Sequence, residues 1–393
     1  MSRTVSWAWE RFDVLLIEAD GKTLFAEHGI PVPAGVVVTD VVPPLPGDRL
    51  WGDGPWMVKA QVPVGGRGKA GGIIRCNTRA EVEAAAARML GGRLKGHPID
   101  ACLVETAAIG QERYLAILVD AASYGLRIIY AARGGMEIEN SGATLNRLCA
   151  PHAGAVGEAL ADLIADEPDA WRDQIAAIGK AMAGMLLARE LALAEINPLF
   201  VSASGCVAGD AKVVIDLNAI YRQPRIASMV AARPAIYVDA CRKIEEGFDY
   251  VELDPSGEIG LVTTGAGLSM MLIDELTARG AKPLNFCDIR TGQMRGSPAR
   301  LIRVLQWITS GPSLKVVLVN IFAGITDLGE FAALLAAAIE ASPLLHVQVV
   351  ARLVGRNAAE AKRILGEAQP AMLVTEDLEE ALARIGAIVG TVR

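Results

Sequence analysis

The chain has 393 residues, of which 52% are hydrophobic, and a formal net charge of -7. This length allows two or three domains with cores of their own, and the negative charge argues against a general nucleic-acid binder. No apolar run reaches the roughly 18 uncharged residues that a membrane helix needs, and the first residues lack the apolar core of a signal peptide. Six scattered cysteines without paired spacing are typical of reduced thiols. We therefore expect a cytoplasmic protein with neither a nucleic-acid nor a membrane partner.

The first part of the chain predicts a helix and strands around a glycine-rich loop. A helix is expected early in residues 13–39, ending at Gly29, and a short strand follows it. Residues 57–62 form the next predicted strand, which carries Lys59, and residues 65–72 contain the glycines. Such a loop lets backbone N–H groups approach phosphate oxygens. Glycine-rich hairpins without a ligand are also common, so this alternative stays open.

Further strands and a long helical segment complete this region. We expect a helix over residues 78–91 and a strand over residues 101–105, with a hinge between two lobes at the end of that strand. The next strand begins at Glu112 and pairs with a strand that starts at Leu126. A helical stretch with one proline break covers residues 155–190. Together these segments predict an α+β nucleotide-binding region.

The polar side chains of greatest interest lie on a predicted hairpin that turns at Gly205. Its first strand carries Glu195 and Asn197, which alternation places on one face, and its second strand returns Asp210 beside them. Carboxylate and amide oxygens of this kind suit a magnesium ion that also holds nucleotide phosphates. The alternative is a β-hairpin with ordinary surface polar residues.

From Glu258 onward the pattern changes to a strict alternation of short strands and helices. The strands are predicted at residues 258–264, 283–289, 314–322, 346–353 and 371–374. Near-continuous runs of Val, Ile and Leu joined by crossover helices indicate a buried parallel sheet, so we expect a flavodoxin-like, doubly wound domain. Glycine-rich loops at residues 264–267 and 323–326 each precede a helix, where free N–H groups favour an anion. The alternative is that these glycines only permit tight turns.

The predicted fold class is therefore α/β and α+β in three parts. Residues 1–224 form the nucleotide-binding region, residues 225–250 a helical connector, and residues 251–393 the flavodoxin-like domain.

Six segments, in this order, resemble the β subunit of succinyl-CoA synthetase. They are KAQVPVGGRGKAGG, LALAEINPLFV, DAK, LNAIYRQP, GAGLSM and VNIFAGI, and the resemblance extends from about Leu24 to the end of the chain. It implies an ATP-grasp nucleotide-binding region followed by a flavodoxin-like CoA-ligase domain. This agrees with the division predicted from the residues alone.

The resemblance also implies roles for individual residues. Asn197 and Asp210 would ligate Mg2+, and Glu195 would steady a phosphohistidine when it visits the nucleotide site. In the family that histidine and most of the CoA site belong to a separate α subunit, and the four histidines of this chain lie outside the matching motifs. The residues implied to bind the nucleotide are Lys59, Gly66, Arg67, Gly68, Glu105, Ala108 and Glu112. Those implied to touch the acid substrate are Thr264, Gly324, Ile325 and Thr326.

The acid site departs from the family pattern. Thr264 stands where the family has Asn, and the segment after Asp288 carries Arg290 and Arg295 in place of a glycine run. The family's N-terminal His-Glu-Tyr-Gln run is also absent. Because the nucleotide motifs persist, we expect retained phosphoryl chemistry with an altered acid. Arg290 would bind a second anionic group of that acid. The alternative is that both arginines are solvated or contact the partner subunit.

The predicted function is the β subunit of an ADP-forming acid–CoA ligase, acting with an α subunit as a heterodimer or an α2β2 assembly. ATP, a carboxylic acid and CoA would give acyl-CoA, ADP and phosphate; GTP is not excluded. The acid is expected to be succinate, a related dicarboxylate such as malate, or a sulfonated acid. Two alternatives are a self-sufficient ATP-grasp ligase and a non-catalytic nucleotide-binding regulatory subunit. The regulatory alternative is disfavoured by the intact set of Lys59, Glu195, Asn197 and Asp210.

Overall fold

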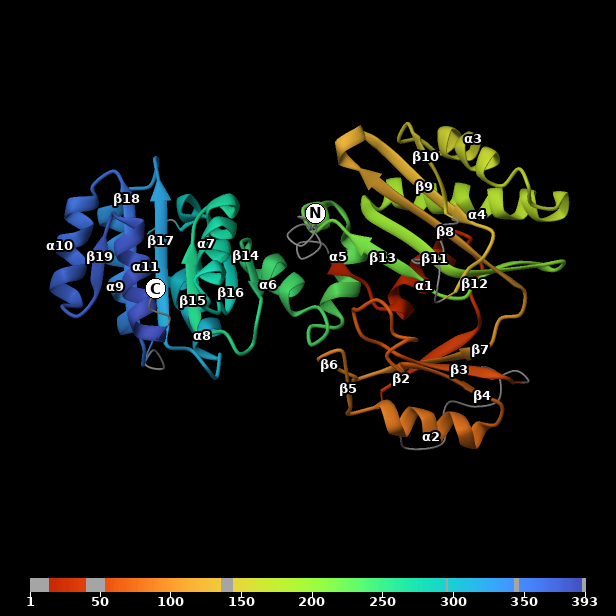
Figure 1. The fold of residues 1–393 in the computed structure, drawn as a ribbon, viewed down its shortest axis with the longest axis horizontal. Helices are drawn as coiled ribbons and strands as arrows, with labels where there is room; N and C mark the ends of the chain where they lie inside the picture. The colour runs from red at the N-terminus through yellow and green to blue at the C-terminus, as the bar shows by residue number, and fades with distance from the viewer. Residues whose placement is uncertain (1–13, 40–53, 136–143, 295, 343–345, 391–393) are drawn as a thin grey trace. The chain divides into compact units, whose positions relative to one another are not determined.

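A computed structural model of the chain describes residues 14–39, 54–135, 144–294, 296–342 and 346–390. These residues form two compact units, one over residues 14–236 and one over residues 237–390 (Figure 1). No helix in the described stretches has both the length and the apolar character that crossing a membrane requires. All six cysteines lie in these stretches as free thiols.

The first unit contains a small antiparallel sheet covered by a helix. The strand order is β2 (Gly35–Val38), β7 (Cys102–Thr106), β3 (Trp56–Ala60) and β4 (Ile73–Cys76). Helix α2 (Arg79–Met89) packs on this sheet through an apolar cluster that includes the fully buried Val58 and Val82. Its N-cap is Thr78, whose hydroxyl accepts the N–H of Glu81. A short hairpin of β5 (Arg93–Leu94) and β6 (His97–Pro98) follows α2.

A larger, seven-stranded sheet forms the rest of the first unit. Its order is β1 (Val14–Leu15), β13 (Lys212–Ile215), β11 (Leu191–Ser202), β8 (Gln111–Asp120), β9 (Gly125–Ala131) and β10 (Leu145–Cys149), with β12 (Gly205–Ala208) also on β11. The helices of this unit are α1 (Glu18–Glu27), α3 (Ala153–Leu163), α4 (Asp169–Ala188) and α5 (Pro224–Ala231), with 3-10 turns at Ala121–Ser123 and Ile220–Arg222. The predicted helical stretch is thus two helices, and Pro168 is the N-cap of the second.

The predicted hairpin is built on the long strand β11. Residues Leu199–Ser202 pair with β12 and residues 191–195 pair with β13, so the chain turns at Gly205 and then again before Lys212. The ladder between β11 and β8 is interrupted between Ile196 and Leu199, at the cis peptide bond between Asn197 and Pro198. The second turn places Gly209 against this irregularity, because the Gly209 N–H donates to Pro198 O at 2.8 Å.

The second unit contains the predicted parallel sheet. Its ladder has four strands, in the order β15 (Ile259–Thr263), β17 (Val316–Ala323), β18 (Gln348–Gly355) and β19 (Leu373–Thr375). The fifth predicted strand, β16 (Asn285–Asp288), forms a ladder instead with an antiparallel strand that the sequence did not predict, β14 (Asp249–Glu252). The backbone ladder of the five predicted strands is therefore interrupted between β15 and β16.

The side chain of Asn285 explains this difference. It accepts the N–H of Leu261 and donates to the Leu261 carbonyl, both at 2.9 Å, and so replaces the backbone bonds in the middle of the β15–β16 pair. Backbone bonds remain on either side, from Leu284 N–H to Ile259 O and from Ile289 N–H to Thr263 O. Strand β16 therefore lies beside β15, and the spatial order of the five predicted strands is the 2-1-3-4-5 order of flavodoxin-like folds.

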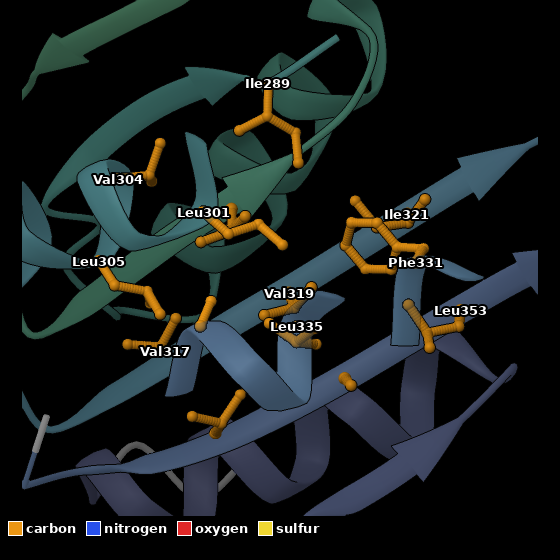
Figure 2. Packing of buried hydrophobic residues seen from close by; sticks show 14 of the residues in the cluster. Ile289, Leu301, Val304, Leu305, Val317, Val319, Ile321, Phe331, Leu335 and Leu353 are labelled. Atoms are coloured by element: carbon orange, nitrogen blue, oxygen red, sulfur yellow. The ribbon is translucent and has the colours of Figure 1, made fainter. Parts of the chain in front are cut away.

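Helices cover both faces of this sheet, as the doubly wound prediction requires. On one face, residues of α8 (Ala299–Thr309), α9 (Leu328–Glu340) and α10 (Ala358–Ala368) share one apolar cluster with the odd-numbered residues of β17, and Figure 2 shows Leu335 beside Val319. On the other face, α7 (Ala266–Ala278) and α11 (Leu378–Val389) pack on Val316 and Leu318. Both faces of β17 are buried, which accounts for its continuous apolar sequence.

The division between the two units falls within the segment predicted as a connector, residues 225–250. Helix α5 belongs to the first unit, and helix α6 (Val238–Glu246) belongs to the second. The domain boundaries at residues 224 and 250 stay a prediction.

Candidate functional site

The first unit holds a buried cluster of charged side chains that come from five separate segments. Helix α1 supplies Glu18 and Lys22, β3 supplies Lys59, the glycine-rich loop supplies Arg67, β7 supplies Glu105, and the turn before β13 supplies Asp210. The side chains of all except Asp210 are at most 7% exposed, and that of Asp210 is 29% exposed. The cluster thus has equal numbers of positive and negative groups, nearly all without access to water.

Glu18 lies at the centre of this cluster. Its Oε1 atom is 2.7 Å from the ammonium groups of both Lys22 and Lys59, and its Oε2 atom is 2.7 Å from Arg67 Nη2 as an ion pair without hydrogen-bond geometry. Burial alone would raise the pKa of Glu18, but the three cations outweigh it and hold the pKa well below 4.5. Glu18 is therefore ionised and keeps the three cations together.

The two lysines share the remaining acceptors of the cluster. Glu105 accepts from Lys22 at 2.6 Å and forms an ion pair of 2.7 Å with Lys59. The carbonyl of Gly209 accepts from the same two ammonium groups at 3.0 and 2.6 Å. Burial would lower the pKa of Lys59, but the carboxylates of Glu18 and Glu105 raise it above its ordinary value, so Lys59 stays charged. A group of fixed, desolvated cations is suited to binding a multiply charged anion such as a polyphosphate.

The glycine-rich loop is wrapped around Arg67. The carbonyl of Arg67 accepts the N–H groups of Ala70 and Gly72, and its Nη1 donates to Ala60 O at 3.1 Å. Gly66 has a φ of +68°, a conformation that favours glycine. Gly66 is exposed and Gly68 half-buried, while the Arg67 side chain turns inward. The predicted loop residues therefore divide into outward glycines and a buried cation.

The predicted metal ligands lie on either side of the contact between Pro198 and Gly209. Asp210 Oδ1 accepts from Arg67 Nη2 at 2.8 Å and from its neighbour's N–H, that of Ala211, also at 2.8 Å. Asn197 Oδ1 accepts the N–H of Gly135 at 2.7 Å, and its Nδ2 donates to the Gly135 carbonyl at 3.3 Å. Both side chains carry the hard oxygens that Mg2+ prefers, and a site with one or two protein ligands completed by phosphate oxygens is ordinary for this ion.

Glu195 lies on the strand that carries Asn197. It pairs across the sheet with Lys212, whose ammonium is 3.5 Å from Glu195 Oε2, and it accepts from the hydroxyl of Tyr114 at 3.3 Å. Burial raises the pKa of Glu195 above 4.5, opposed by Lys212 and Tyr114, and the charge of Asp210 raises it further. Asp210 is one of the predicted metal ligands, so the charge at that site acts on the pKa of Glu195.

The segment between β7 and β8 connects the two sheets of this unit. Its N–H groups at Thr106 and Ala107 donate to Ala34 O and Pro55 O, which anchors the start of the segment to the small sheet. Ala108 is half-buried and Glu112 exposed. Glu105, which the resemblance implies to bind the nucleotide with them, lies among the buried cations.

The predicted acid-site residues lie at the carboxyl ends of parallel strands in the second unit. Gly265, next to Thr264, donates its N–H to Asp288 Oδ1 at 2.9 Å. Thr326 exchanges a hydroxyl hydrogen bond of 2.8 Å with Thr291, which is 9% exposed. These two bonds join the loops after β15, β16 and β17. Gly324 and Ile325 are exposed, Ile325 to 95%.

Arg290 already has an acidic partner in its own chain. Its guanidinium is 2.8 Å from Asp249 Oδ2, and Lys243 is 2.8 Å from the other oxygen of Asp249. The Arg290 side chain is 40% exposed and its φ is +48°. Arg295, the second arginine of this segment, lies outside the described residues.

Comparisons with known proteins identify the family. Residues 15–201 match the model of the ATP-grasp domain, and residues 262–387 match the CoA-ligase model. The chain is 36% identical over 397 residues to the β subunit of ADP-forming succinate–CoA ligase from Thioalkalivibrio sulfidiphilus, with 95% of this chain and 99% of that protein covered. The corresponding subunit from Chloroflexus aurantiacus is 36% identical over 383 residues, covering 94% and 98%. The chain belongs to this family of ligase β subunits. It is thus an ADP-forming acid–thiol ligase with an ATP-grasp region and a CoA-ligase domain, as predicted.

A solved structure extends the likeness of fold. The structure of ATP citrate lyase from Methanothrix soehngenii in complex with citrate and coenzyme A superposes with a TM-score of 0.71, covering 96% of this chain and 100% of that chain. The identity is 16%, so this likeness concerns the fold alone.

Two residues of the cluster, Glu18 and Lys22, were missed in the sequence. They lie four residues apart at the start of α1, a spacing that places an acidic and a basic side chain on one helix face. That spacing was visible, but it is common on solvent-exposed helices. Thr291 was also missed, because a threonine in a loop has no signal of its own.

Proposed function

We propose that this chain is the nucleotide-binding β subunit of an ADP-forming acid–CoA ligase. The enzyme would convert ATP, a small carboxylic acid and CoA into acyl-CoA, ADP and phosphate through an acyl phosphate. A phosphohistidine on a CoA-binding α subunit would carry the phosphoryl group between the two sites. The observation that supports this best is the convergence of Lys59 and Arg67 with Asp210 in one buried cluster.

The cluster would bind the phosphates of the nucleotide. Carboxylates hold Lys59 and Arg67 in place, so these side chains would lose little conformational entropy when a phosphate replaces a carboxylate partner. The exposed Gly66 and the half-buried Gly68 would offer backbone N–H groups to the same phosphates. Ala108 and Glu112, in the segment that joins the two sheets, would line the adenine and ribose side.

Asp210 and Asn197 would hold Mg2+ together with the phosphates. Asp210 shares Arg67 with Glu18, so Arg67 keeps a carboxylate partner even when Asp210 turns to the metal. The metal, when bound, neutralises charge on the transferring phosphoryl group. Glu195, a half-buried carboxylate on the same strand as Asn197, would orient the imidazole of the partner's histidine by accepting its N–H.

The acid would bind at the carboxyl ends of β15 and β17. Thr264 and the loop Gly324–Thr326 each precede a helix, and their N–H groups would face the carboxylate that becomes the acyl phosphate. Arg290 would bind a second anionic group of the acid. Its ion pair with Asp249 would then be partly given up. This favours succinate, another dicarboxylate such as malate, or a sulfonated acid.

The experiment is a coupled assay of ADP release with CoA and a panel of mono-, di- and sulfonated carboxylic acids. It is run with the chain co-expressed with its CoA-binding partner, and with the chain alone. We expect acid-dependent ADP release and thioester formation only from the pair, and a preference for acids that carry two anionic groups. Thioester formation by the chain alone would favour a self-sufficient ligase, and the absence of acid-dependent ADP release would reject the proposal.

A further inference from the structure

Lys22 is a buried cation that none of the matching motifs contains. It lies on α1, its side chain is 6% exposed, and its ammonium contacts Glu18, Glu105 and the carbonyl of Gly209. All three of these partners belong to the cluster around Lys59.

Lys59 makes contact with the same three groups. Its ammonium lies 2.7 Å from Glu18, 2.7 Å from Glu105 and 2.6 Å from Gly209 O. The contacts with Glu18 and Gly209 O are hydrogen bonds, and the contact with Glu105 is an ion pair. An ammonium has three protons to donate, so we expect Lys59 to draw away from Glu105 when it gives its third proton to a phosphate oxygen.

The two carboxylates cannot be left without a cation. The side chains of Glu18 and Glu105 are 0% and 2% exposed, and a buried carboxylate that loses its partner is strongly unfavourable. Arg67 would remain on Glu18. For Glu105, Lys22 is the remaining cation in contact among the ion pairs of the described residues.

We infer that Lys22 is a positioning residue that neutralises Glu18 and Glu105 when Lys59 turns to the nucleotide phosphates. The inference rests on the proposed function, because it requires that Lys59 contacts a nucleotide. Lys22 already lies on both carboxylates, so the exchange needs movement of the Lys59 ammonium only. The helix α1 thereby belongs to the nucleotide site, although its residues need not touch the nucleotide.

Lys22→Met is expected to change the protonation of Glu105 when nucleotide binds. When Lys59 moves to the phosphate in this variant, Glu105 has no cation and is expected to take up a proton from water. Nucleotide binding would then be coupled to the uptake of about one proton, and the coupling would weaken binding as the pH rises. In the wild type, Lys22 neutralises Glu105, so Glu105 stays ionised and takes up no proton.

The test is calorimetric titration of the full-length chain with Mg-ADP at pH 8 in two buffers of different ionisation enthalpy. For Lys22→Met we expect binding to be about 10- to 100-fold weaker, which corresponds to the loss of one hydrogen bond to a charged group. We also expect extra proton uptake that approaches one proton. For Lys22→Arg, which keeps the charge, affinity and proton uptake should stay near those of the wild type. Lys180→Met, which removes an exposed lysine on α4, is the matched control and should change neither.

If Lys22→Met does not fold, Lys22→Met combined with Glu18→Gln takes its place, because it removes one cation and one carboxylate together. Glu105 still loses its only remaining cation in this variant, so the same proton uptake is expected. Mg-ADP binding within about twofold of the wild type and without extra proton uptake, in whichever of these variants folds, would overturn the inference. A wild-type chain that does not bind Mg-ADP would overturn the proposed nucleotide site itself, which separates the two failures.

Discussion

Replacement of Lys59 by methionine tests both the energetics of the buried cluster and its role. The variant keeps the apolar stem but removes an ammonium that is bonded to Glu18, Glu105 and Gly209 O. Removing one partner of a buried ion pair costs about 3–5 kcal/mol. Lys22 still touches both carboxylates, so we expect the lower end of this range, about 3 kcal/mol.

This cost corresponds to a lowering of the melting temperature. For a domain of 150–250 residues, each kcal/mol shifts Tm by about 2–4 °C, so Lys59→Met should lower the Tm of the first unit by about 6–12 °C. The assay is thermal unfolding of the full chain followed by circular dichroism, with the exposed Lys180→Met as control. A Tm within about 2 °C of the wild type would refute the free-energy cost assigned to the loss of the Lys59 ammonium.

The same variant should change the response to acid. The pKa of Glu18 in the folded protein lies well below 4.5, because its cations outweigh burial. Its contribution to stability is therefore present above the unfolded pKa and is lost as the pH falls through the folded pKa. Removing Lys59 takes away one of the cations that lower this pKa, so the variant should lose stability at a higher pH than the wild type. Coincident acid-unfolding curves would contradict this argument.

Three further substitutions test separate parts of the site. Asp210→Asn should depress Mg2+-dependent phosphoryl transfer by orders of magnitude while the circular dichroism spectrum stays native; normal turnover at saturating Mg2+ would reject the metal assignment. Glu195→Gln should slow phosphorylation of the partner's histidine and leave Mg-ADP affinity unchanged, as a rapid-quench measurement beside a calorimetric titration can establish. Arg290→Ala should raise KM for the preferred acid about tenfold, from the loss of one hydrogen bond to a charged group, with no change in KM for ATP. If the order of preference among acids is the same in this variant, Arg290 has no role in specificity.

Local patterns in the sequence were sufficient to predict most secondary structure. The alternation in residues 191–201 and the glycine at 205 predicted the β11–β12 hairpin, and the apolar runs predicted β15, β17, β18 and β19. Strand β14 was not predicted, because Asp249–Glu252 follows a helix directly and has too few residues to show a period. The break in the ladder beside β16 depends on the Asn285 side chain, which substitutes for backbone groups. Strand periodicity carries no information about such a bond.

The composition of the site was predicted less completely than the fold. Lys59, Arg67 and Asp210 belong to recognisable motifs, and the structure brings these three together. The common partner of Lys59 and Arg67 is Glu18, which is 41 residues from Lys59 and lies on a helix with no glycine or phosphate motif. Only the folded chain shows that this helix faces the loop. The predicted pairing of Arg290 with a substrate anion likewise took no account of Asp249, a residue on the unpredicted strand β14.

We propose that this chain performs ATP-dependent acid–CoA ligation only together with a CoA-binding partner that is phosphorylated on histidine. The most direct measurement combines γ-labelled ATP, Mg2+, CoA and the preferred acid with the chain alone, the partner alone and the pair. We expect the pair to form ADP and acyl-CoA in equal amounts and, when the acid is omitted, the label to accumulate on the partner. Label retained on this chain, formation of AMP in place of ADP, or acyl-CoA formed without the partner would contradict the claim.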